Sequence, residues 1–304
     1  MTNNQKAAIN AASSFSLVDA TEEVDVDALT TLNAALTGSL SGDINLTGAA
    51  ARLIHTSNKA AVDSSKTVKV TDSSINVAKA LEVLALGGGT KSYVLEDTTT
   101  ALLAASTATV SGSTTVKITG GAAITATVLK QITDKYTLKK FADPTPVNDS
   151  VENLVNILTT DLVAEISSFG NPTGTATLAQ LNTLETVTGT KAISIAVADS
   201  ATNLLAGLQS TVKTTADTAL ANLDGASSIT LTGTATAEQV AAINAFLLSN
   251  GAGTGLDAVA ATYTLSDSIA NLLAAETGAK STAATKAVIA DAAKISITDN
   301  AAKS

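Results

Sequence analysis

The octapeptide that decides the fold is Asp267-Ser-Ile-Ala-Asn-Leu-Leu-Ala274, because a near-copy of it occurs at Asp199-Ser-Ala-Thr-Asn-Leu-Leu-Ala206. Looser copies begin at Asp149, Asp97 and Asp72. A sequence that repeats a short phrase along its length is typical of a protein built from stacked units, each of which packs only on its neighbours. The repeats therefore predict an array rather than a single globular core.

A second phrase alternates with the first. Gly233-Thr-Ala-Thr236, followed by Gln239, matches Gly174-Thr-Ala-Thr177, followed by Gln180. Taken together, the two phrases mark eleven turns along the chain: Asp19, Gly48, Asp72, Asp97, Gly120, Asp149, Gly174, Asp199, Gly233, Asp267 and Asp299. Ten intervals separate residues 19 and 299, so the mean repeat, here called a rung, is 28 residues long.

Each turn follows a strand-like segment and precedes a helix-like one. The strand-like segments alternate β-branched and polar residues with period two, at 68–71, 93–95, 116–119, 193–197, 229–232, 263–265 and 295–298. After the turns the apolar spacing becomes helical, as in Ile269, Leu272 and Leu273. Strands joined through a helix pair in parallel with a right-handed crossover. The sequence therefore predicts an α/β fold: an elongated solenoid of about 28-residue strand-turn-helix rungs, with a parallel sheet on one face and short helices on the other.

Repeat quality divides the chain into four parts. Residues 1–60 are expected to form degenerate N-terminal rungs or an assembly segment, and residues 61–136 to form solenoid rungs. All three prolines lie between the turns at Gly120 and Asp199. Because proline is confined to sheet edges, strand starts and bulges, residues 137–173 are predicted to be an irregular, proline-containing joint or insertion. Residues 174–304 are predicted to form further rungs that end in an uncapped C-terminal edge.

The composition excludes several classes of function. The 304 residues carry a net charge of −9 and a single arginine, Arg52, so a nucleic-acid phosphate backbone is a poor partner. Cysteine is absent and His55 is the only histidine, which excludes disulfides, thiolate nucleophiles and Cys/His zinc sites. Only 2% of the residues are aromatic, whereas binding sites usually depend on aromatic anchors.

Targeting signals are not evident in the sequence. The N-terminal residues lack the basic start and apolar run of a cleavable signal peptide. No apolar stretch approaches the ~20 residues that span a bilayer. We therefore expect no membrane insertion, and any export would use a route without an N-terminal signal.

The recurrent aspartates form the best-defined polar set. At a strand-to-helix turn an aspartate can accept hydrogen bonds from the first N–H groups of the helix, an N-cap role worth about 1 kcal/mol. The alternative role is calcium binding, which requires six to eight oxygen ligands. Calcium is the only cofactor that we consider for this chain. The candidate metal ligands are Asp72, Asp97, Asp149, Asp199, Asp267 and Asp299. Asparagines four residues after the turns are expected to bond the backbone from rung to rung: Asn76, Asn153, Asn203 and Asn271.

The C-terminal strand suggests self-association. Residues 295–298 form a good strand and Asp299 opens a further rung that the sequence does not complete. A terminal strand presents unpaired N–H and C=O groups to another chain. A heterologous contact of this kind that does not close produces a filament or lattice, so we expect head-to-tail association. The alternative is that the chain is an excerpt of a longer array.

Phrases such as those at residues 263–274 and 229–236 resemble large Thr/Ala-rich repeat proteins of bacterial cell surfaces, which are surface-layer or adhesin-like and are exported without an N-terminal signal peptide. The similarity covers residues 66–300. It implies an extracellular, cell-surface location and a structural role as a filament, surface-layer or matrix subunit whose partner is itself, with cell-surface polysaccharide as a further partner. The second hypothesis is an adhesin or fibre-type module that binds through a solenoid face. An enzyme such as a polysaccharide lyase is disfavoured by the single arginine and single histidine.

Overall fold

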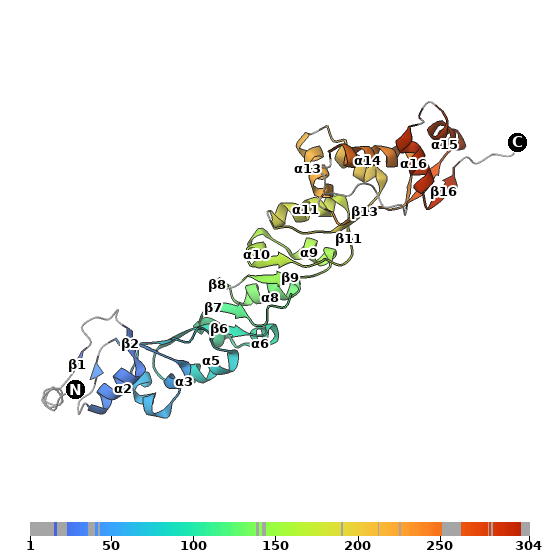
Figure 1. Cartoon of the computed structure of the whole chain (residues 1–304). Helices are drawn as coiled ribbons and strands as arrows, with labels where there is room; N and C mark the ends of the chain where they lie inside the picture. Colours follow the sequence, from blue (N-terminus) through green and yellow to red (C-terminus); the bar gives the residue numbers. More distant parts are fainter. Residues whose placement is uncertain are drawn as a thin grey trace. The chain divides into compact units, whose positions relative to one another are not determined.

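The computed structural model describes residues 15–16, 23–35, 40–41, 43–137, 140–141, 144–189, 191–211, 213–224, 226–250, 263–278, 280 and 282–298. The predicted turns at Asp19 and Asp299 lie outside these ranges. The helices and strands are labelled in Figure 1. The contacts within the chain divide it into two compact units. Unit 1 comprises residues 1–122 and 128–145, and unit 2 comprises residues 123–127 and 146–304.

Unit 1 is built on a parallel sheet whose strand order is β2-β4-β5-β6-β7-β8. A separate parallel pair joins β1 to β3. The strands are β1 (Phe15–Ser16), β2 (Glu23–Asp25), β3 (Leu40–Ser41), β4 (Asn45–Gly48), β5 (Thr67–Val70), β6 (Thr90–Asp97), β7 (Ser113–Ile118) and β8 (Lys140–Phe141). The helices are α2 (Val26–Ala35), α3 (Ala50–Leu53), the 3₁₀ turn η1 (Thr56–Asn58), α4 (Lys59–Asp63), α5 (Val77–Leu84), α6 (Thr99–Ala104) and α7 (Thr107–Gly112).

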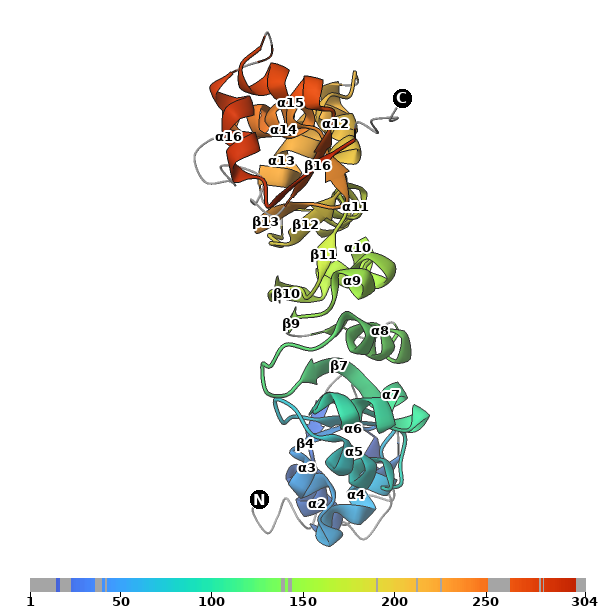
Figure 2. The ribbon, with the colours of Figure 1, turned by 90° about the vertical axis from the view of Figure 1, so that its right-hand side faces the viewer.

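Two elements, α8 (Ala126–Lys135) and β9 (Thr145–Val147), each contain a boundary between the units. The other strands of unit 2 are β10 (Ile166–Phe169), β11 (Thr175–Ala176), β12 (Ala196–Asp199), β13 (Ser228–Leu231), β14 (Thr234–Ala235), β15 (Thr264–Asp267) and β16 (Lys294–Ile297). Its helices are α9 (Val151–Ile157), α10 (Thr160–Ala164), α11 (Leu178–Thr188), α12 (Ala201–Leu208), α13 (Lys213–Asp224), α14 (Ala237–Asn250), α15 (Ile269–Glu276) and α16 (Ala283–Asp291) (Figure 2).

The predicted α/β class with parallel sheets is confirmed, since every ladder with a described register is parallel. Residues 137–173, expected to be an irregular joint or insertion, contain β8, β9, α9, α10 and β10. Pro146 lies inside the short strand β9, where its carbonyl accepts a hydrogen bond from Ile124. A proline is accommodated there because the ladder uses its carbonyl and not the N–H group that it lacks.

The sheet is not continuous, contrary to the expectation of one sheet along the array. In unit 2 the ladders form separate sheets in the orders β10-β9, β11-β12-β13 and β14-β15-β16. Gly174 and Gly233 cause the interruptions, because each separates two strand segments and has a positive φ, of 86° and 72°. This conformation suits glycine and turns the chain sharply. The segment before each glycine ends one sheet, and the segment after it begins the next.

The rungs also carry more helix than the predicted single short one. The turns at Asp97, Asp149, Asp199 and Asp267 are each followed by two helices before the next strand. Within the described residues, the turns at Gly120, Gly174 and Gly233 are followed by one helix of 10 to 14 residues. Most of these helices begin with a Ser or Thr hydroxyl that accepts from the N–H three residues later, at Thr98, Ser106, Ser150, Thr159, Thr177, Ser200, Ser268 and Thr282.

Small aliphatic side chains fill the core between strands and helices. Alternate residues of neighbouring strands line up and are fully buried, for example Leu46 beside Val68 in unit 1 and Val197 beside Ile229 in unit 2. Burial of each such side chain stabilises the fold by about 1.5–3 kcal/mol. The strand period of two thus directs one face of each strand into the core.

The three tyrosines are the largest buried side chains. Their hydroxyls donate to main-chain carbonyls: Tyr93 to Thr109, Tyr136 to Leu102 and Tyr263 to Val288. Burial, chiefly, raises the pKa of each tyrosine to about 12. Each ring therefore anchors a strand or helix end to a carbonyl of the helical layer.

The raised tyrosine pKa values predict alkaline unfolding. In the unfolded chain these phenols lose their protons near pH 10, whereas in the folded protein they hold them to about pH 12. Their contribution to stability is therefore intact below pH 10 and is lost as the pH rises towards 12, at about 1.4 kcal/mol per pKa unit. Circular dichroism and tyrosinate absorbance, followed together, should show a coincident transition in this window. Full tyrosinate absorbance near pH 10 with the fold intact would contradict the burial.

Candidate functional site

The recurrent aspartates link neighbouring rungs, and Asp199 shows how. Its Oδ1 accepts from the N–H of Ser200 and from the side-chain amide of Asn203, both at 2.7 Å. Its Oδ2 accepts at 3.0 Å from the N–H of Leu178, the first residue of α11 in the preceding rung. The side chain is 5% exposed. One buried carboxylate thus joins its own turn to the start of the previous helix.

The same arrangement recurs in other rungs. Asp149 accepts from Ser150, Asn153 and the first residue of α8, Ala126. In unit 1, Oδ2 of Asp97 accepts from Val77 at the start of α5, and Oδ2 of Asp72 accepts from Ala50 at the start of α3. The carboxylate therefore serves the helix of the preceding rung in both units.

This geometry differs from the predicted one in two respects. The helix that directly follows each of Asp97, Asp149, Asp199 and Asp267 is capped by the next residue, a Ser or Thr, and not by the aspartate. The asparagines do not bond the backbone of another rung, because Asn153, Asn203 and Asn271 donate to their own aspartates and Asn76 caps α5. The Ser that follows Asp149, Asp199 and Asp267 was the available sequence signal for the capping role.

The candidate metal ligands are not gathered into one site. Among the residues that the structure describes, no three Asp, Glu or His side chains lie close enough together to hold a metal ion. Asp72, Asp97, Asp149 and Asp199 each use at least one carboxylate oxygen as a hydrogen-bond acceptor for a helix N–H. Asp299 lies outside the described residues. Calcium binding by this set stays a prediction.

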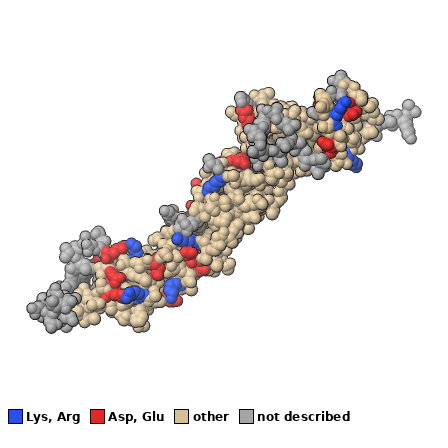
Figure 3. All heavy atoms as spheres, viewed as in Figure 1, with Lys and Arg blue, Asp and Glu red and all other residues tan. Residues whose placement is uncertain are grey.

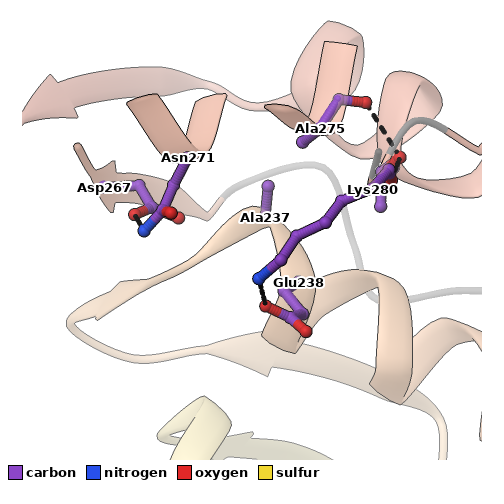
Figure 4. A pocket seen from close by; sticks show the side chains of 7 residues that line it. Ala237, Glu238, Asp267, Asn271, Ala275 and Lys280 are labelled. Atoms are coloured by element: carbon purple, nitrogen blue, oxygen red, sulfur yellow. Dashed lines mark hydrogen bonds and ion pairs between the residues drawn. The ribbon is translucent and has the colours of Figure 1, made fainter. Parts of the chain in front are cut away.

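Asp267 departs from the pattern and lines a cavity of about 270 Å³ (Figure 4). Its Oδ1 accepts from Ser268 and Asn271, as in the other rungs. No described N–H group reaches its Oδ2, although the side chain is only 7% exposed. The other residues that line the cavity are Ala237, Glu238, Asn271, Ala275, Lys280 and Thr285.

A paired substitution between repeats explains the cavity. In the preceding pair of rungs the helix begins with Leu178, whose Cδ2 lies 2.5 Å from where a Cβ on Gly207 would be. The leucine therefore occupies the space above the glycine. In the later copy the equivalent residues are Ala237 and Ala275. The shorter Ala237 leaves that space open beside Asp267.

An ion pair lies beside the cavity. Lys280 Nζ lies 2.6 Å from Glu238 Oε2, and both side chains are at least half exposed. Hydrogen bonding to Glu238, together with the charges of Glu238 and Asp267, raises the pKa of Lys280. Asp267, Glu238 and Lys280 all line the cavity, so two carboxylates and one ammonium give its lining a net negative charge.

The Leu178–Gly207 contact gives a test of this repeat comparison. Gly207→Ala should lower the free energy of unfolding by about 1–3 kcal/mol, because its methyl group overlaps Leu178. Leu178→Ala in the same chain should relieve the overlap, since the pair then matches Ala237 and Ala275. Urea unfolding of the two single variants and the double variant measures the coupling. Additive losses would show that the two positions do not share this space.

The second feature is an apolar outer face on the last described rung. It consists of Ile269 and Leu273 on α15 and Ile295 and Ile297 on β16, which are 43–57% exposed. These four residues line an open, largely apolar groove of about 240 Å³, together with Leu272, Ile289 and Glu276. We call Ile269, Leu273, Ile295 and Ile297 the outer face. The sequence predicted an open strand here, but not that its inward side chains and the adjoining helix would be exposed.

The repeats supply an internal control for this exposure. β16 pairs with β15 in the same register in which β13 pairs with β12. Ile295 and Ile297 of β16 therefore correspond to Ile229 and Leu231 of β13. The two earlier residues are 0% and 6% exposed. Likewise Ile269 corresponds to Ala201 and Val151, which are both buried. Ile269, Ile295 and Ile297 of the outer face are therefore apolar residues at positions that are buried in the earlier rungs.

Charged side chains of both signs are scattered over the surface shown in Figure 3. The single histidine, His55, accepts from the N–H of Ser57 at the start of η1. No helix in the described part of the chain is both long and apolar enough to cross a membrane.

Comparison of the chain with protein-family models, curated proteins and solved structures found no match.

Proposed function

We propose that this chain is a non-enzymatic structural protein, an α/β solenoid that associates head-to-tail through its outer face into a filament, surface layer or matrix. The observation that carries the proposal is the exposure of Ile295 and Ile297, whose counterparts Ile229 and Leu231 are buried. An apolar patch of this kind marks a contact surface. Among the described residues β16 pairs with β15 alone, and a strand edge of this kind supports strand addition.

The solenoid proposal rests on contacts between successive rungs. In each larger sheet, neighbouring strands come from consecutive rungs. The aspartate links also join consecutive rungs, as Asp149 joins α8 and Asp199 joins α11. Stability in such proteins is approximately a sum of nearest-neighbour terms, so a terminal rung gains stability when a further unit covers it.

The cell-surface location and the absence of catalysis are parts of the same proposal. The location rests on the similarity of residues 229–236 and 263–274 to Thr/Ala-rich surface proteins. The absence of catalysis rests on a composition with one histidine and no cysteine. An adhesin that binds polysaccharide through a solenoid face is the competing function, and it differs in requiring no self-association.

Light scattering and electron microscopy of the purified chain test the proposal. We expect the mean mass to increase with protein concentration and filaments or sheets to form, with measurements made with and without calcium. A mass that stays monomeric at high concentration in both conditions would overturn the proposal. Binding of polysaccharide by such a monomer would then favour the adhesin.

A further inference from the structure

We propose that the surface that covers the outer face is strand β2 of a second copy, added in parallel to β16 with Glu23 beside Lys294. This inference rests on the proposed head-to-tail assembly and adds the partner surface and the register. Among the described residues, β16 pairs only with β15, and β2 pairs only with β4. Each of these two strands is therefore the last of its sheet.

The strand directions are compatible. Every ladder with a described register is parallel, and in each sheet of three or more strands the next strand is added on the side away from the previous one. The side of β16 away from β15 is therefore the side on which a following strand belongs. The side of β2 away from β4 is where a preceding strand belongs. A contact between these two edges uses different surfaces on the two copies, so it leaves one of each available for further growth.

The inward side chains restrict the register. Val24 aligns with Leu46 and Val68, which are both buried, so Val24 is the inward residue of β2. Ile295 aligns with the buried Leu265 and is an inward residue of β16. Because side chains alternate with period two, Val24 can lie beside Ile295 or Ile297 if the two cores are to join.

Charge selects between these two registers. With Val24 beside Ile295, the exposed Glu23 lies beside the exposed Lys294; with Val24 beside Ile297, Glu23 lies beside Ser296. Lys294 has no carboxylate partner among the described residues. Glu23 already pairs with Lys69 at 2.6 Å, but it remains about half exposed and can accept a second cation. The register with Val24 beside Ile295 thus pairs opposite charges at the edge of the contact.

Because the chain contains no cysteine, engineered disulfides can test the register directly. Residues side by side on paired strands have Cα atoms at a distance that a disulfide can bridge. In an oxidised mixture of the single variants Glu23→Cys and Lys294→Cys, we expect a cross-linked heterodimer. A mixture of Ser73→Cys with Lys294→Cys measures random cross-linking, since Ser73 is an exposed residue of unit 1 outside its strands.

Ser296→Cys alone distinguishes the other arrangement. If two C-terminal faces paired about a two-fold axis, with Ile295 beside Ile297 of the partner copy, Ser296 would lie opposite itself. Efficient self-cross-linking of this variant, without the 23–294 cross-link, would overturn the inference. Assembly by light scattering with neither cross-link would also overturn it while leaving the proposed function intact. A wild-type chain that does not assemble would overturn the proposed function itself.

Charge reversal gives a second readout. Lys294→Glu should raise the concentration needed for assembly roughly fivefold or more, because it sets two like charges side by side. Adding Glu23→Lys in the same chain should restore part of the loss, since every contact then pairs the reversed charges while the new ammonium also lies beside Lys69. Circular dichroism checks that both variants fold. An unchanged assembly concentration in Lys294→Glu would contradict the register.

Discussion

Replacing Asp199 by alanine should lower the free energy of unfolding by about 3 kcal/mol. The substitution removes three hydrogen bonds to a buried carboxylate, two within its own turn and one to Leu178 of the preceding rung. It leaves the N–H groups of Leu178 and Ser200 without their acceptor, and a hydrogen bond to a charged group contributes about 1.5–3 kcal/mol. The negative charge near the start of α11 is also lost. Urea unfolding followed by circular dichroism measures the change.

Two further variants show whether the loss comes from the link between rungs. Asp199→Asn keeps the shape but sets an amide donor against a backbone N–H, so an intermediate loss of about 1.5 kcal/mol is expected. Asp161→Asn removes an exposed carboxylate on α10 and should change stability by less than about 1 kcal/mol. Equal effects of Asp161→Asn and Asp199→Asn would show that general charge, and not this hydrogen-bond geometry, sets the stability.

Placing aspartates at Ile295 and Ile297 should abolish self-assembly while leaving the fold intact. Both side chains lie on the outer face and are 43% and 56% exposed, so their charges are solvated in the single chain. In an assembled pair they would be desolvated among apolar groups, which costs several kcal/mol per charge. Each 1.4 kcal/mol weakens association tenfold, so assembly should disappear at any practical concentration. Light scattering provides the measurement.

The matched control is Leu81→Asp. Leu81 is 49% exposed on α5, so the substitution makes the same chemical change at an apolar residue outside the outer face. It should leave assembly unchanged. Loss of assembly in Leu81→Asp, or retained assembly in the Ile295 and Ile297 double variant, would contradict the proposed role of this surface. Thermal melts of both variants separate assembly from folding.

Seven of the strands and their parallel class could be predicted from the sequence, because β-branched alternation and helical spacing are local signals. Residues 295–298 and 229–232, for example, fall within one residue of β16 and β13. The division of the sheet was not predicted, because it depends on the positive φ of Gly174 and Gly233, which a sequence does not state. The hydrogen bond from the preceding helix to each aspartate was also not predicted. That helix begins about 20 residues earlier, and it meets the carboxylate only after the rungs pack.

The candidate sites were predicted in part for the same reason. The strand of the outer face is visible in the sequence, because residues 295–298 alternate with period two. The cavity beside Asp267 depends on two distant residues, Ala237 and Ala275, which become neighbours only in the fold. Alignment of the repeats shows that Leu178 and Gly207 occupy the equivalent positions. Only the fold shows that the two residues share one space, since Leu178 Cδ2 lies 2.5 Å from where a Cβ on Gly207 would be.

The interruptions at Gly174 and Gly233 also bear on how unit 2 opens. Between them lie the sheet β11-β12-β13 and helices α11 to α13, which the Asp199 carboxylate holds together. Among the described residues, no strand ladder continues past either glycine from one sheet to the next. Segments joined in this way exchange their amide hydrogens as cooperative blocks. Amides from residue 175 to residue 231 should therefore share one opening free energy, with steps in protection at the two glycines.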